Sequence, residues 1–148
     1  MSGLLVQELK LDKIDKFLKK IRNNYEDIYP GGTPCVRGIR TENTLYISGI
    51  TAFGSKAEGG SLTNQLEVIL DRIIRIVEFE GGKASDIVAM TTYIVDSKMS
   101  EYEPSKGKQL QIWNQYFKGA WPTNAYIGVS CLAASTVDLE ITTTVIFD

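Results

Sequence analysis

The chain has 148 residues, of which 43% are hydrophobic and 23% are charged, with no low-complexity tract. These values predict one globular domain. The formal net charge of −2 argues against nucleic acid as an obligatory partner, because phosphate recognition needs concentrated Lys and Arg. The absence of histidine excludes Ser-His-Asp triads, Cys-His dyads and His-ligated zinc. Two cysteines, Cys35 and Cys131, cannot form the usual four-ligand metal cluster, so we expect neither metal nor cofactor.

The N-terminus alternates charged and apolar residues within a few positions and resembles neither a signal peptide nor a membrane span. We therefore expect a cytoplasmic protein with reduced thiols and no membrane partner. Within an N-terminal extension of residues 1–34, apolar residues at helical spacing predict an amphipathic helix over about 12–23. Residues 29–32, Tyr-Pro-Gly-Gly, are a helix-breaking cluster.

The core is expected over residues 35–148. Cys35–Arg40 and Leu45–Ile50 read as two strands joined by a polar turn, and so predict a hairpin. Gly49, directly after Ser48, interrupts the second strand. It marks either a bulge without a ligand or a close backbone approach, and both interpretations stay open.

Two long helices follow. Ser61 is a suitable N-cap for a helix over 61–78 with a wide apolar stripe, and Gly81-Gly82 ends it. Ile87–Val95 is apolar on both faces, as expected of a strand inside a sheet. A second helix is expected over about 105–118, with aromatic residues on its inner face.

The last stretch has the most regular pattern. Tyr126–Cys131 reads as a strand, and from Val137 onward apolar residues alternate with polar ones, so that Glu140 lies on the polar face of a long final strand. The short connection at 133–136 predicts an antiparallel hairpin between these two strands. Asn124 would then lie within reach of the neighbourhood of Glu140.

This order of elements predicts an α+β fold with one mixed sheet and the two long helices on one face. No further helix remains in the core to cover the other face. The face that bears Glu140 and Thr142 is therefore expected to be open to water or packed against another copy of the chain.

Ser48-Gly49, the helix with an internal Gln65, DIVAMTTYIVD, WPTN and VDLEI together resemble the Rid family, also called YjgF/YER057c/UK114 or endoribonuclease L-PSP. The resemblance runs from about Cys35 to Phe147. It implies a chorismate-mutase-like fold assembled as a homotrimer, with clefts between adjacent subunits. It also implies cofactor-independent hydrolysis of reactive enamines and imines to 2-oxo acids and ammonia.

The resemblance also implies site residues. Glu140 falls on the family glutamate that positions the attacking water, and Ser48 and Gly49 fall on the Ser-Gly pair. Cys35 stands where the family has tyrosine, and Asn124 stands where it has the arginine that grips the substrate carboxylate. Tyr126 and Cys131 complete the expected binding residues, the latter through backbone N–H groups that could hold a developing oxyanion.

Replacement of the arginine by Asn124 removes a charge-assisted bidentate contact. This loss should cost roughly 2 to 5 kcal/mol, so efficient turnover of 2-imino acids is not expected unless Arg37 or Arg40 supplies the charge. Cys35 could be a nucleophile, but an inert small-hydrophobe interpretation is favoured because no histidine accompanies it.

Three functions remain. The first is a Rid-type hydrolase of an imine, enamine or related small metabolite, with Glu140 activating water. The second is a non-catalytic trimer that binds a small metabolite in the same clefts. Ribonuclease activity ranks third, because an acidic chain without histidine lacks both the electrostatic footprint and the usual acid-base pair.

Overall fold

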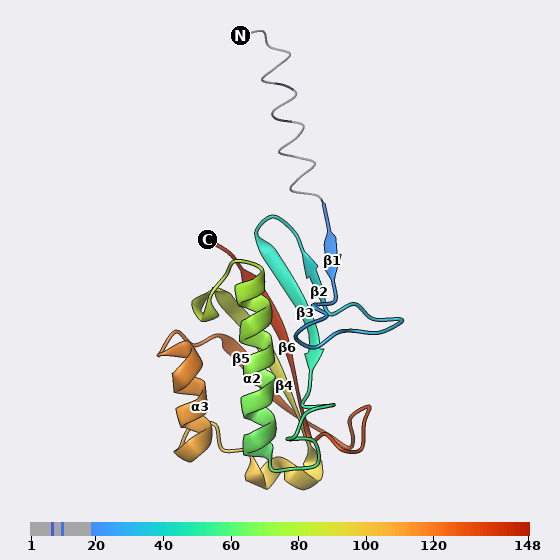
Figure 1. The fold of residues 1–148 in the computed structure, drawn as a ribbon. Coiled ribbons are helices and arrows are strands. Elements are labelled where there is room, and N and C mark those ends of the chain that lie inside the picture. The colour runs from blue at the N-terminus through green and yellow to red at the C-terminus, as the bar shows by residue number, and fades with distance from the viewer. Residues whose placement is uncertain (1–6, 8–9, 11–18) are drawn as a thin grey trace.

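The computed structural model describes residues 7, 10 and 19–148. They form a mixed six-stranded sheet with two long helices, α2 (Leu62–Phe79) and α3 (Gly107–Phe117), side by side on one face (Figure 1). This arrangement confirms the expected α+β fold. Two short 3-10 segments, η1 (Ala84–Asp86) and η2 (Asp96–Glu101), flank the fourth strand.

The six strands follow the order β1-β2-β3-β6-β4-β5. All neighbouring pairs are antiparallel except β4 and β5, which are parallel and joined through η2 and α3. The strands are β1 (Ile21–Asn23), β2 (Gly38–Arg40), β3 (Thr44–Ile50), β4 (Ile87–Val95), β5 (Thr123–Val129) and β6 (Leu139–Ile146).

Helix α2 fixes the core because its sequence both starts the helix and supplies an apolar stripe. The Ser61 hydroxyl accepts a hydrogen bond from the Asn64 amide at 3.2 Å, which satisfies one of the free N–H groups of the first turn. The buried stripe packs on β3 and β6, and each fully buried Leu or Ile contributes about 1.5 to 3 kcal/mol. Its fully buried members are Leu66, Ile69, Leu70, Ile73, Ile76 and Val77.

The expected hairpin of the last two strands is wrong. Strand β5 lies at the edge of the sheet and pairs only with β4, whereas β6 lies between β3 and β4. The connection is longer than the sequence indicates, because β5 ends at Val129 and β6 begins at Leu139. This connection carries the chain past β4 to the place of β6 between β3 and β4. There, alternating Leu139, Ile141 and Val145 of β6 are buried against the helices, and both edges of β6 are paired.

Two N-terminal expectations also need correction. The expected helix at about 12–23 is wrong over its last three residues. Ile21–Asn23 is instead strand β1, which pairs with the free edge of β2. Pairing with an open sheet edge outweighs local helix propensity over so few residues. Residues 12–18 of that helix lie outside the described residues. The expected strand Cys35–Arg40 is shortened to Gly38–Arg40, so Cys35 lies in a loop.

The sheet has two different faces. Alternate residues such as Met90, Ile94 and Ile141 point to the helices and are buried. No helix among residues 19–148 covers the opposite face, on which Tyr46, Ile127 and Ile146 are exposed. None of the helices in the described part of the chain combines the length and hydropathy that crossing a bilayer requires.

Candidate functional site

Glu140 lies near the start of β6, on the face of the sheet that carries no helix. It stands opposite Tyr93 of β4 and is partly buried. Its side chain lines a cavity of about 290 Å³ at the end of the sheet. The other lining residues are Tyr29, Gly49, Thr51, Phe53, Ala133, Ala134 and Val137. We call this the Glu140 pocket.

Gly49 is required by the approach of Glu140. The pairing of β3 with β6 shifts register between Ile47 and Ile50, so a bulge lies at Ser48-Gly49. A Cβ atom on Gly49 would lie 1.9 Å from Glu140 Oε1, far inside van der Waals contact. The structure therefore shows a bulge that brings bare backbone against the Glu140 carboxylate, and a close approach to a ligand stays a prediction.

Arg37 holds the wall of the pocket together. Its Nε donates to the Tyr29 carbonyl oxygen at 2.8 Å, Nη2 donates to the Pro30 carbonyl oxygen at 3.0 Å, and Nη1 donates to the Gly49 carbonyl oxygen at 2.8 Å. Nη1 also lies 3.3 Å from the Ser48 hydroxyl. With 9% of the residue exposed, the guanidinium is a buried clamp between the N-terminal loop and the bulge.

Burial controls the charge of the Glu140 carboxylate. Desolvation raises its pKa above the ordinary glutamate value, and the positive charge of Arg37 partly opposes that rise. A carboxylate with a raised pKa is a stronger base toward water at working pH than an exposed one. The pocket therefore places a carboxyl group of raised pKa beside the backbone of a β-bulge.

Tyr29 lies between two cations. The guanidinium carbons of Arg37 and Arg72 lie 4.1 and 4.0 Å from the centroid of its ring, and its hydroxyl lies 3.0 Å from Thr51 Oγ1. Such stacks fix both arginines and the ring together. The sequence did not indicate Tyr29 as a site residue, because it lies in a helix-breaking cluster that has no periodic pattern. Its position beside Glu140 follows only from the clamp.

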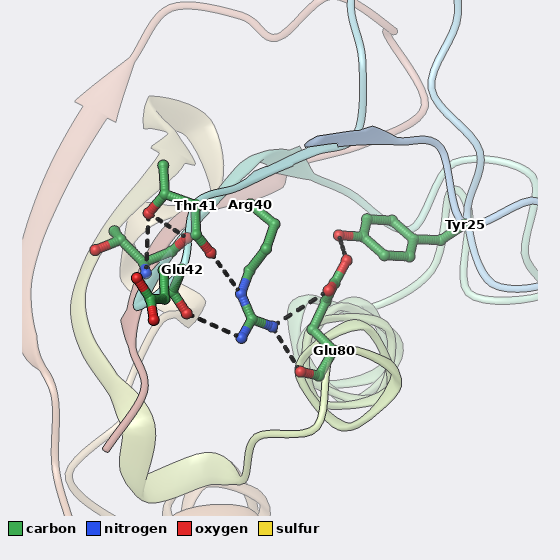
Figure 2. Close-up of polar contacts among 6 residues, drawn as sticks. Tyr25, Arg40, Thr41, Glu42 and Glu80 are labelled. Atoms are coloured by element: carbon green, nitrogen blue, oxygen red, sulfur yellow. Dashed lines mark hydrogen bonds and ion pairs between the residues drawn. The ribbon is translucent and has the colours of Figure 1, made fainter. Parts of the chain in front are cut away.

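Arg40 belongs to another part of the molecule. Its Nη1 donates to the carbonyl oxygen of Glu80 at 2.6 Å and forms an ion pair with the Glu80 carboxylate at 3.3 Å (Figure 2). The Tyr25 hydroxyl donates to the same carboxylate at 2.7 Å. Arg40 therefore closes the end of α2. It is not a substitute cation for the Glu140 pocket.

Asn124 and Tyr126 lie on the other face of the sheet. Asn124 stands beside Met90, and Tyr126 stands beside the buried Thr92, so both project toward the helices. Asn124 Oδ1 accepts a hydrogen bond from the Thr92 hydroxyl at 3.0 Å. The expectation that Asn124 lies near Glu140 of the same chain is wrong, because it depended on the hairpin that does not form.

The two cysteines lie outside the Glu140 pocket. Cys35 and Cys131 are both exposed free thiols in loops, and neither lines the Glu140 pocket. Whether Cys35 is inert or nucleophilic stays a prediction, because its exposure fits either interpretation. Among the described residues, no three His, Cys, Asp or Glu side chains gather in a way that could hold a metal ion.

A sequence model of the endoribonuclease L-PSP family matches residues 31–147. The chain belongs to this family. Solved structures of the family, also named Rid or YjgF, share the fold. No curated protein matches the sequence.

The match to this chain covers nearly the whole length of three such structures. A conserved Rid-family protein of unknown function from Yersinia pestis is 22% identical, with a TM-score of 0.72 over 86% of this chain and 99% of its own. A YjgF/YER057c/UK114 family member from Mycobacterium tuberculosis is 18% identical, with a TM-score of 0.66 over 86% and 99%. A YjgF-family protein from Neisseria meningitidis is 15% identical, with a TM-score of 0.70 over 89% and 98%. At these identities the likeness shows the fold alone.

The family match begins after one strand of the sheet and one residue of the Glu140 pocket. Strand β1 and Tyr29 precede residue 31, yet β1 extends the sheet and Tyr29 lines the Glu140 pocket. Tyr25, also before the match, is buried at 3% exposure in the core. In this chain, residues outside the matched segment therefore help to build the pocket.

Proposed function

We propose that this protein is a cofactor-independent hydrolase of a small imine, enamine or related metabolite, acting in clefts between the subunits of a cytoplasmic homotrimer. The observation that carries the proposal is the half-buried Glu140, whose pKa is raised by burial and whose carboxylate rests on the bare backbone of Gly49. Membership of the Rid family and the family resemblance of Glu140 support the same reaction.

The chemistry needs one base and one water molecule. Glu140 accepts a proton from water while the oxygen forms a bond to the imine carbon, and the C=N electron pair moves to nitrogen, which takes up that proton from Glu140 and so regenerates the carboxylate. Collapse of the resulting amino alcohol breaks the C–N bond and releases ammonia and a carbonyl compound. No oxidant or reductant takes part, because the carbon keeps its oxidation state.

Assembly would complete the site. Asn124 and Glu140 lie on opposite faces of one sheet, so they can share a cleft only if a neighbouring copy supplies one of them. The helix-free face supports self-association, because Tyr46, Ile127 and Ile146 are exposed there among threonine side chains. In such a cleft the Asn124 amide would bind a carbonyl or hydroxyl group.

Ammonia release on challenge with 2-aminoacrylate, 2-iminobutanoate and neutral imines tests the proposal. We expect turnover of a neutral or differently charged imine above the spontaneous rate, abolished by Glu140→Gln, and little turnover of 2-iminobutanoate. Asn124→Arg should create 2-iminobutanoate hydrolysis, because it restores a charge-assisted fork for the carboxylate. A Glu140→Gln protein as active as the parent would refute the role of the carboxylate.

The alternative is a trimer that binds a metabolite without transforming it. It is favoured by the engagement of Arg37, whose guanidinium already makes hydrogen bonds to three backbone carbonyl groups and has no second fork for a substrate carboxylate. Under this alternative, no imine is hydrolysed and Glu140→Gln changes ligand affinity by no more than about 1 to 2 kcal/mol. Thermal-shift titration with metabolites identifies a ligand under either function, because it detects binding without assuming a reaction, and the ammonia assay with that ligand then separates the two.

A further inference from the structure

A groove outside the Glu140 pocket lies at the C-terminal end of α2. Its volume is about 520 Å³. One wall is the segment at the end of β1 and after it, residues 23–28, and the other is the end of α2 from Arg75 to Phe79. Neither Glu140 nor Asn124 lines the groove, so it is separate from the proposed substrate cleft. We call it the helix-end groove.

Contacts between the two walls fix the shape of this groove. The Tyr25 hydroxyl donates to Glu80 Oε1 at 2.7 Å (Figure 2), and the Tyr25 ring meets the Phe79 ring edge to face, with centroids 5.5 Å apart. Arg75 Nη2 lies 3.5 Å from the Asp27 carbonyl oxygen. The helix-end groove is therefore built by contacts with α2 and is not a gap between loops.

The groove combines an exposed aromatic ring with an acidic rim. Phe79 is 65% exposed. The carboxylates of Glu26, Asp27 and Glu78 line the groove with it, and none of the three forms an ion pair within the described part of the chain. Arg75 is the lining cation against these three anions. The groove is therefore negative overall, and a basic segment with apolar side chains complements it.

A segment of that chemistry directly precedes β1. Residues 10–20, KLDKIDKFLKK, contain five lysines against two aspartates. Leu11, Ile14 and Leu18 follow the i, i+3, i+7 spacing that places apolar side chains on one helical face. So short a helix is marginal in water by itself, and its apolar stripe needs a surface to cover. Of this segment, the structure describes residues 10, 19 and 20.

This basic segment ends close to the helix-end groove. Asn23 lines the groove and stands three residues after the segment. At the start of β1, Ile21 pairs with Arg40, whose Nη1 donates to the Glu80 carbonyl oxygen at the end of α2 (Figure 2). Ten residues span up to about 33 Å when extended, whereas one turn of α2 rises only about 5 Å. A reversal of the chain before β1 therefore suffices to bring the segment to the groove.

We propose that residues 11–20 dock in the helix-end groove of their own chain, with their apolar side chains on Phe79 and their lysines toward the carboxylates. Removal of apolar surface from water drives the contact, and the charges select the segment that binds. The helix-free face also exposes apolar side chains, such as Tyr46, but no acidic residue lines the cavity beside Tyr46. A lysine-rich segment is therefore disfavoured there.

This inference goes beyond the proposed function. Both the wall at residues 23–28 and the docking segment precede residue 31, where the family match begins. The docking is therefore a property of the N-terminal extension of this chain. It neither requires nor produces hydrolysis, and Glu140→Gln should leave it unchanged.

Photo-crosslinking in the full chain measures the docking. Benzoylphenylalanine in place of Phe17, next to Leu18, keeps an aromatic apolar side chain and bonds on illumination to C–H groups that it touches. We expect crosslinks within one chain, which mass spectrometry maps to residues 23–28 and 75–79. Assemblies of mixed light and isotope-labelled heavy chains distinguish these crosslinks from those between chains. Raised salt should lower the yield, because it screens the charges.

A charge reversal on α2 tests the acidic rim. Glu78→Lys places a cation in the last turn of the helix, where the helix dipole favours it, so the fold should be kept. It should lower the crosslink yield about fivefold. Glu67→Lys is the matched control, because Glu67 is an exposed glutamate on the same helix that does not line the groove. It should leave the yield unchanged.

A charge swap tests complementarity. Lys13→Glu combined with Lys16→Glu should lower the yield as Glu78→Lys does. Adding Glu26→Lys and Glu78→Lys to this double variant restores opposite charges and should recover the yield. Circular dichroism confirms that each variant is folded, so a loss of yield reports on docking.

Four results would overturn the inference. One is no crosslink from position 17. A second is crosslinking only between light and heavy chains, which would show that a neighbouring copy supplies the segment. A third is crosslinking confined to the helix-free face around Tyr46. The fourth is an equal loss of yield in Glu78→Lys and Glu67→Lys, since the charge of the groove would then not select the segment.

Discussion

Arg37 links the stability of the fold to the charge of the candidate base, and its replacement by methionine tests both. Arg37→Met keeps much of the buried aliphatic stem but removes the guanidinium. Three backbone carbonyl groups, those of Tyr29, Pro30 and Gly49, then lose their charged donor in a site that is nearly closed to water. We expect the loop over residues 29–30 to loosen.

The magnitude follows from these contacts. A hydrogen bond to a charged group contributes about 1.5 to 3 kcal/mol, and such contributions overlap when they share one side chain. A loss of about 3 to 5 kcal/mol in the free energy of unfolding is therefore expected, a large part of the total stability of a domain of this size. Equilibrium denaturation with urea, monitored by circular dichroism, measures it.

The same substitution changes Glu140. The charge of Arg37 lowers the pKa of this carboxyl group against the larger effect of burial, so Arg37→Met should raise that pKa further. Arg37→Lys is the matched control, because it keeps the charge but loses the fork. It should lower stability while leaving the pKa of Glu140 near its parental value. NMR titration of the labelled carboxyl carbon reads the pKa without any substrate.

An unfolding free energy of Arg37→Met within about 1 kcal/mol of the parent would show that the Arg37 clamp contributes little to stability. Equal shifts of the Glu140 pKa in Arg37→Lys and Arg37→Met would contradict an effect of the Arg37 charge, since they would come from altered packing.

Three further predictions concern single contacts. Gly49→Ala should displace the Glu140 carboxylate, lower stability by about 1 to 3 kcal/mol and reduce any hydrolysis, as denaturation and ammonia assays would show; parental activity would contradict it. The folded-state pKa of Glu140 is raised, so the stability of the parent relative to Glu140→Gln should be constant at pH values below the ordinary glutamate pKa. It should fall as pH rises from there through the raised pKa; a gap that is constant over this whole range in parallel urea melts would be inconsistent. Tyr25→Phe removes the hydroxyl that donates to Glu80 and should cost about 1 to 2 kcal/mol; if that bond is the cause, Glu80→Gln should make the two substitutions non-additive in a double-mutant cycle.

The sequence alone determined the elements whose signals are local. The Ser61 cap and the apolar stripe of α2 can be recognised from residues close together in the sequence. The same holds for the alternation that turns Glu140 away from the core. These patterns depend on backbone periodicity and on which side chains avoid water, so they need no knowledge of the rest of the chain. The motif order also indicated the family that the match over residues 31–147 confirms.

Only the tertiary structure decided which strands pair and which side chains share a face. A strand pattern does not say which edge it will pair with, so the same alternation in β6 fits a hairpin with β5 or a place between β3 and β4. That choice moved Asn124 to the helix side, away from Glu140. Likewise, Tyr29 and Arg37 reached the pocket through hydrogen bonds to backbone carbonyl groups, which every sequence contains and no sequence pattern reveals.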